Sequence, residues 1–228
     1  MASSASTLVI GSGPGIGSSI AQRLRARGDS VIELPPTIDL TNAELVGESL
    51  RSLIGSGTVD RVVLAAIDPS GFRSAPIASL TEAEWDQAAE YSMRAAFVAL
   101  QQAYAVLADG GRVILILPTV VATGVAGLVP LCTAVETIRV MAKAVARRWG
   151  ARSITVNTIE VELAAFMLGD NDAGNTEIPV VPVLGQPALP PASAVDDVIG
   201  LIDMLATPAA GAITGALLVA DRGTVMQP

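Results

Sequence analysis

Short, unbroken apolar runs alternate along the chain with longer segments in which apolar residues recur at helical spacing. The runs predict strands at residues 7–10, 30–34, 59–66, 112–117, 153–159 and 215–220. The longer segments predict helices at residues 16–27, 41–54, 81–107, 131–149 and 193–205. Strands that alternate with helices indicate an α/β fold, in which a doubly wound parallel sheet carries helices on both faces.

Three stretches depart from this alternation. Pro35 and Pro36 end the second strand so close to the next apolar triplet that no crossover helix fits between them. Residues 113–135 carry no charge over a length that could span a bilayer. Prolines and glycines interrupt them, so we expect a buried strand, a loop and a helix start, and no membrane segment. Residues 160–193 are rich in proline and predict a lid or insertion in a single domain that spans residues 1–228.

Composition narrows the classes of function. With 228 residues, 51% of them hydrophobic, the chain is long enough to bury one large core. A net charge of -8, with Lys143 as the one lysine, argues against a nucleic-acid partner. One cysteine, Cys132, and no histidine remove the usual zinc sites, so we expect no metal. Met1 and the small residues after it lack the basic start of a secretion signal, which favours the cytoplasm.

A glycine-rich loop follows the first strand and opens the first helix. In that context glycines permit a tight turn and let the backbone approach a pyrophosphate, while the helix start supplies N–H groups. The pattern therefore predicts a Rossmann-type nucleotide site, although a close-packed turn would also explain the glycines. The candidate binding residues in this loop are Gly11, Ser12, Gly13, Gly15, Ile16 and Gly17.

With this loop the chain resembles the short-chain dehydrogenase/reductase family, whose loop has Thr where Ile10 stands here. Further matches follow in order along nearly the whole chain. By resemblance, Asp39 and Leu40 lie where the family touches adenine, and Ala65 and Ala66 lie in the cofactor wall. The other matching segments are residues 110–114, 156–157, 214–215 and 221–223.

The active-site positions depart from the family pattern. The resemblance implies an Asn, a Ser, a Tyr and a Lys, which bind a carbonyl oxygen and move its proton. Aligned on Asn157, these positions fall on Ser92, Pro118, Leu131 and Val135. Leu, Val and Pro side chains neither donate nor accept a proton. We therefore expect no catalytic residue of the family type.

The cofactor wall has changed too. Ile67 adds bulk where the family has Gly. The second strand ends at Leu34, with Glu33 too early to bind a ribose hydroxyl and no Arg nearby for a 2′-phosphate. The sequence therefore leaves NAD and NADP both open, and weak or absent binding remains an equal alternative.

Other polar residues offer alternatives. Thr119, Cys132 and Glu136 repeat the family spacing one residue later, but a Glu does not replace a Lys in lowering a neighbour's pKa, so a buried Cys and a capping Thr are favoured. Glu160 and Glu162, at the end of a strand, form either an acid/base pair or solvated loop carboxylates, and we favour the latter.

Two further polar residues receive plain structural interpretations. Asp68 also follows a strand and is assigned to a solvated loop in the same way. Tyr91 lies in a predicted helix, where half-buried packing is the expected role.

These observations favour a non-catalytic subunit. A degenerate member of the family would pair with an active paralogue through helices 85–107 and 131–149, as a homo- or hetero-oligomer. The alternative is an oxidoreductase homologue with changed chemistry: a non-standard NAD(P)H-dependent reductase, or a cyclase or isomerase with an apolar pocket. A nucleotide-sensing module is the third interpretation.

Overall fold

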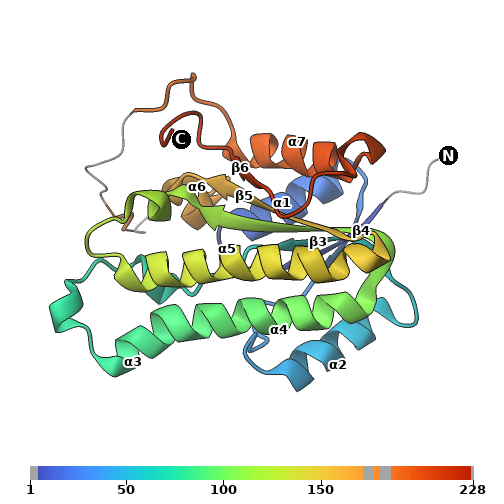
Figure 1. Cartoon of the computed structure of the whole chain (residues 1–228), viewed down its shortest axis with the longest axis horizontal. Helices are drawn as coiled ribbons and strands as arrows, with labels where there is room; N and C mark the ends of the chain where they lie inside the picture. Colours follow the sequence, from blue (N-terminus) through green and yellow to red (C-terminus); the bar gives the residue numbers. More distant parts are fainter. Residues whose placement is uncertain (1–4, 172–176, 180–185, 227–228) are drawn as a thin grey trace.

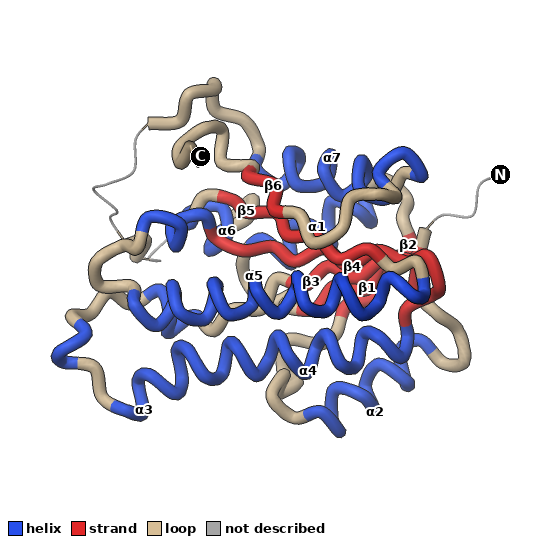
Figure 2. The backbone as a smooth tube through the Cα atoms, in the orientation of Figure 1, coloured by secondary structure: helices blue, strands red, loops and turns tan. Residues whose placement is uncertain are grey.

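The computed structural model describes residues 5–171, 177–179 and 186–226, which form one parallel six-stranded sheet between two layers of helices (Figures 1 and 2). The strand order is β2-β1-β3-β4-β5-β6, and every pair is parallel. The predicted doubly wound α/β fold is thus confirmed. The strands are β1 (Ser6–Ile10), β2 (Ser30–Glu33), β3 (Val59–Leu64), β4 (Leu107–Pro118), β5 (Thr155–Val161) and β6 (Leu217–Val219).

Two hydrophobic cores lie on opposite faces of this sheet. Helices α2, α4 and α5 cover the first core, and α1 and α7 cover the second (Figure 1). None of the helices in the described part of the chain is long and apolar enough to cross a bilayer. The helices are α1 (Ile16–Ala26), α2 (Ala43–Ile54), α3 (Glu82–Trp85), α4 (Tyr91–Val106), α5 (Val129–Trp149), α6 (Leu163–Leu168) and α7 (Ala194–Ala206).

Residues 8–10 of β1 and 113–117 of β4 are unbroken apolar runs because these segments contribute side chains to both cores. In β1, Leu8 and Ile10 enter the first core while Val9 enters the second. In β4, Leu115 and Ile116 divide in the same way. Successive side chains of a strand point to opposite faces, so a strand covered on both sides needs an unbroken apolar run.

Helix starts were predicted closely, with one correction. Thr81 and Glu84 form the expected capping box, and Ser193 caps α7 by accepting from the N–H of Asp196. Helix α2 is capped by Asn42, not by Thr41 as the capping-box spacing suggested. The Thr41 hydroxyl instead donates to Asp39.

The predicted helix over residues 81–107 is one continuous helical segment with a π-helical turn inside it. It consists of α3, a π-helical turn at Asp86–Glu90 and α4, and it ends at Val106. Leu107 already belongs to β4 because it pairs with Val59, so the strand begins earlier than predicted.

The first part of the predicted lid over residues 160–193 is regular secondary structure. Glu160 lies inside β5, and Glu162 is the single residue between the end of β5 and the start of α6. After α6, the Asp170 carboxylate pairs with Arg23 at 2.7 Å, and its N–H donates to the Ser19 hydroxyl at 2.9 Å. These contacts fix α6 against α1. Residues 172–176 and 180–185 of the predicted lid lie outside the described residues.

Candidate nucleotide site

A cavity of about 510 Å³ opens at the carboxyl ends of β1, β2 and β3. The strand order places β2 on one side of β1 and β3 on the other, so the topology reverses here. Ligands of open α/β sheets bind in the crevice at such a reversal. Residues of the segments 11–17, 34–40 and 65–72 line the cavity, together with side chains from α4 and α6.

The glycine loop forms the base of this cavity, and its glycines are required by close packing. A Cβ on Gly11 would lie 2.5 Å from the carbonyl oxygen of Ala65, and Gly11 has a φ of +89°. A Cβ on Gly17 would lie 2.1 Å from the Gly11 oxygen, and one on Gly15 would lie 2.9 Å from that of Phe166. The turn, the sheet and α6 therefore meet backbone to backbone at these positions.

The other loop residues divide between cavity and scaffold. Gly13 and Ile16 line the cavity, and Gly13 has no heavy atom closer than 3.9 Å to a Cβ placed on it. The Ser12 hydroxyl points away and donates to the Leu34 carbonyl at 3.0 Å. Ser12 thus ties the loop to the end of β2, while Gly13 leaves space at the start of α1.

The residues predicted to contact the adenine or to form the cofactor wall line this cavity, except for Asp39. Leu40, Ala65 and Ala66 line the cavity. Asp39 does not, because its carboxylate accepts from the Thr41 N–H at 2.9 Å and from the Thr41 hydroxyl at 2.8 Å. These two hydrogen bonds hold the pKa of Asp39 below its usual value.

Tyr91 and Asp68 line the cavity, which the sequence interpretation did not foresee. Burial raises the pKa of Tyr91, and the negative charges of Asp39 and Asp68 raise it further. Asp68 is not simply solvated, since it accepts from the Ser70 N–H at 2.9 Å and from Gln87 at 2.8 Å. A phenol beside two carboxylates comes from three separate segments, so no local sequence signal could have identified it.

The positions that correspond by resemblance to the family's catalytic residues are buried. Leu131 and Val135 have no exposed surface, and Pro118 is buried at the end of β4. None of the three lines the cavity in the described part of the protein. Ser92 is fully buried; its hydroxyl donates to the Ala88 carbonyl at 2.9 Å and accepts from the Asp68 N–H at 3.0 Å.

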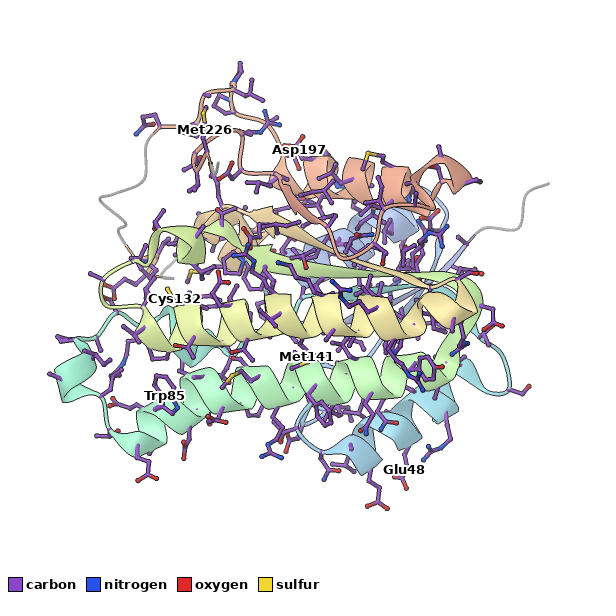
Figure 3. The ribbon with its side chains drawn as sticks, viewed as in Figure 1. Glu48, Trp85, Cys132, Met141, Asp197 and Met226 are labelled. Carbon is purple, nitrogen blue, oxygen red and sulfur yellow. The ribbon has the colours of Figure 1, made fainter. Side chains whose placement is uncertain are left out.

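The alternative set Thr119, Cys132 and Glu136 does not assemble into a reactive group. The Thr119 hydroxyl donates to the Val161 carbonyl at 3.2 Å. Cys132 lies in the first turn of α5 (Figure 3), where burial raises the pKa of its thiol. Glu136 pairs with Arg139 on its own helix.

Glu160 and Glu162 are also separated. Glu160 is fully buried and lies 3.3 Å from Nε of Arg139 on α5. Glu162 accepts from the Thr224 hydroxyl at 2.6 Å. Neither lines the cavity, and Glu160 is not the solvated loop residue that we expected. Among the residues with described positions, no group of three acidic, Cys or His side chains is placed to hold a metal.

Comparison with known proteins finds a family model that matches the chain and solved structures that share its fold. Residues 36–225 match a family model described as Enoyl-(Acyl carrier protein) reductase. No curated protein matches the chain in sequence.

Several solved structures share the fold over nearly the full length. A dehydrogenase/reductase from Sinorhizobium meliloti is 25% identical, with a TM-score of 0.77 over 97% of this chain and 95% of its own. A blue fluorescent protein from a metagenomic library, in complex with NADPH, is 25% identical, with a TM-score of 0.74 over 97% and 98%. A short-chain dehydrogenase/reductase from Serratia marcescens, at 24% identity and a TM-score of 0.75 over 97% of both chains, shows the same fold.

Proposed function

Since the chain belongs to the short-chain dehydrogenase/reductase family, as the match over residues 36–225 shows, we propose that it is a non-catalytic member. In this role it keeps the glycine loop for a nucleotide and acts as a subunit paired with an active member of the family.

The burial of Pro118, Leu131 and Val135 carries this proposal. By resemblance, these positions correspond to the hydroxyl, phenol and amine of the family. Here Leu131 and Val135 pack in the first core, and Pro118 is buried at the end of β4. General acid–base catalysis needs a titratable group within hydrogen-bond reach of the reacting atom. None of these three apolar side chains can donate or accept a proton, so the family's own acid–base chemistry has no group to carry it at these positions.

A nucleotide remains the best-supported ligand of the cavity. A NAD(P)H molecule would supply a hydride, and Gly11, Gly13 and Gly17 at the start of α1 fit its phosphates. The metagenomic relative is described in complex with NADPH, which supports a nucleotide as the ligand. Leu34 stands at the end of β2, and Glu33 pairs with Arg25 at the surface. Neither residue distinguishes NAD from NADP.

A paired helix surface supports the role as a subunit. Helices α4 and α5 run side by side on one face of the molecule (Figure 1). Phe97 and Tyr104 on α4 are 52% and 40% exposed, and Val140 on α5 is 63% exposed. Exposed aromatic side chains are typical anchors of protein interfaces. We propose that this helix surface, defined by Phe97, Tyr104 and Val140, binds a second subunit.

Co-purification with an active family member, encoded by a neighbouring gene, tests the proposal. We expect a complex of fixed stoichiometry, which Phe97→Glu disrupts. Leu53→Glu on α2, where Leu53 is 44% exposed, is the matched control and leaves the complex intact. The isolated chain is expected to reduce no carbonyl or imine with NADH or NADPH. Turnover by the isolated chain would overturn the proposal.

The second candidate is a non-standard reductase or isomerase, and Tyr91 is the observation that favours it. Its phenol is a proton donor on the cavity wall, beside Asp68. In this case the isolated chain would be active, and Tyr91→Phe would abolish the activity while leaving nucleotide binding intact.

A further inference from the structure

The last turn of α6 lies directly on the start of α1. A Cβ placed on Gly15 would lie 2.9 Å from the carbonyl oxygen of Phe166 and 3.0 Å from that of Met167. In the opposite direction, a Cβ placed on Gly169 would lie 2.7 Å from the Gly15 oxygen. Gly15 and Gly169 have φ values of +128° and +61°, which side chains rarely allow. The two helices therefore meet backbone to backbone.

This contact joins helix ends of opposite partial charge. Gly15 is the N-cap of α1 and forms no side-chain capping hydrogen bond, and the first turn after it carries no acidic residue. The N–H groups at such a helix start carry a partial positive charge, and the last carbonyl groups of a helix carry a partial negative charge. The carbonyl groups of Phe166 and Met167 belong to the last turn of α6. Helix α6 thus brings negative charge to the uncapped start of α1.

A phosphate at the same helix start would compete with α6. Phosphates bind helix N-termini through the N–H groups and the positive end of the dipole, and phosphate oxygens repel carbonyl oxygens of like partial charge. Gly11, Gly13 and Gly17 line the cavity, whereas Gly15 is buried beneath α6. One part of the glycine loop is therefore open to a ligand, and the part at the helix cap is covered.

The attachment of α6 is weak enough for a ligand to break. Asp170, just after α6, pairs with Arg23 of α1 at 2.7 Å, and its N–H donates to the Ser19 hydroxyl at 2.9 Å. The Arg23 and Asp170 side chains are 43% and 37% exposed, and ion pairs at such exposure contribute little. Phe166 and Met167 line the cavity, so a ligand there touches α6 directly.

From this geometry we propose that α6 is an autoinhibitory element of the nucleotide site. In the free protein its last turn covers Gly15, and the phosphates of a nucleotide displace it from the start of α1. Nucleotide binding and the release of α6 are then one coupled event. This inference rests on the nucleotide loop of the proposed function, but not on the partner subunit.

Variants of the attachment test the proposal by calorimetric titration with ADP. Asp170→Asn removes the ion pair to Arg23, and Ser19→Ala removes the acceptor of the Asp170 N–H. We expect each change to raise the affinity for ADP by about threefold, and the two together by about tenfold. ADP affinities equal to that of the wild type in all three proteins, each shown to be folded by its melting curve, would overturn the proposal.

Asp196→Asn is the matched control. Asp196 on α7 pairs with the same Arg23 at 2.9 Å, so its loss removes an equal charge without releasing α6. The ADP affinity of this variant should stay within twofold of the wild type. A rise as large as that of Asp170→Asn would assign the effect to charge alone and overturn the role of α6.

Hydrogen exchange measures the displacement itself. A bound ligand ordinarily slows exchange, but here saturating ADP should speed the exchange of the peptide 163–171 at least twofold. The peptide 194–206, which contains α7, should exchange no faster with ADP than without it. Unchanged or slower exchange over residues 163–171 would overturn the proposal.

The outcomes also distinguish this inference from the proposed function. ADP binding that is equal in the wild type and the attachment variants defeats the inference alone. No heat with ADP in any of these proteins defeats the nucleotide loop and the inference together. Tighter ADP binding by the attachment variants, with no complex with an active family member, defeats the subunit role alone.

Discussion

The hydroxyl of Ser92 accepts a hydrogen bond from the backbone N–H of Asp68 at a distance of 3.0 Å. Ser92 is fully buried in α4, and Asp68 caps the turn at Pro69–Phe72, which lines the cavity. Ser92, which stands where the resemblance places the family's Asn, thus holds the wall of the cavity in position.

Ser92→Ala should therefore destabilise the protein. The change leaves the Asp68 N–H without its partner, which costs about 1–2 kcal/mol in the free energy of unfolding. Urea denaturation measures the loss. Ser52→Ala, at an exposed position of α2, is the matched control and should leave stability unchanged or slightly higher. Equal midpoints for the two variants would contradict the assigned role.

Substitutions in the glycine loop should differ sharply by position. Gly17→Ala brings a Cβ to 2.1 Å from the Gly11 oxygen, so we expect a loss of more than about 2 kcal/mol in stability. Gly13→Ala meets nothing closer than 3.9 Å and should change stability by less than about 0.5 kcal/mol. Thermal melting without ligand compares the two. Similar melting temperatures would show that the loop relaxes more easily than its packing implies.

The reactivity of Cys132 should be low at neutral pH and rise late with increasing pH. Burial raises the pKa of its thiol above the usual value, with a further contribution from the charge of Glu136. The pKa of Cys132 is higher in the folded protein than in the unfolded chain. The protonated thiol therefore contributes to the free energy of unfolding at pH values below the unfolded pKa, and this contribution is lost as the pH rises through the folded pKa. Cys132 is the one cysteine of the chain, so iodoacetamide labelling followed by mass spectrometry reports on it alone. A labelling midpoint below that of a free thiol would revive Cys132 as a nucleophile.

Arg61 should contribute more to stability than an exposed arginine. Its side chain is 6% exposed, and it lies 3.3 Å from Asp29 and 3.6 Å from Asp203. Arg61→Met removes the positive charge that faces these two carboxylates. We expect the free energy of unfolding to fall by about 2 kcal/mol. This is less than is usual for a buried ion pair, because the Asp203 side chain is 46% exposed. The control is Arg73→Met, whose 66% exposed side chain pairs with Glu84 at the surface and should cost less than about 0.5 kcal/mol. Denaturant titration measures the stability of both variants. Equal unfolding midpoints would contradict the larger contribution predicted for Arg61.

The strands could be predicted well because their apolar runs reflect burial on two faces. Val62 and Val63 point into different cores, so the sequence needs an unbroken run there, and this is visible without a structure. The π-helical turn at Asp86–Glu90 was not visible in the sequence. This turn packs against α5 and against the turn that contains Phe72, and such contacts leave no local pattern.

The same limit applies to the site. That Pro118, Leu131 and Val135 carry side chains that cannot donate or accept a proton follows from their chemistry alone, so the sequence was sufficient for this point. It was not sufficient to show that these residues lie outside the cavity lining, or that Phe72 meets Phe166. Those facts depend on contacts between segments far apart in the chain.

The contact between Gly17 and Gly11 bears on how such a chain changes over generations. Both positions exclude a side chain because of the protein's own backbone, whatever the cavity holds. A descendant that abandoned its ligand would still be under selection to keep both glycines, simply to fold. Persistence of this loop among descendants would record the demands of folding, and divergence at Gly13, where a Cβ has space, would be the earlier sign that a ligand had been lost.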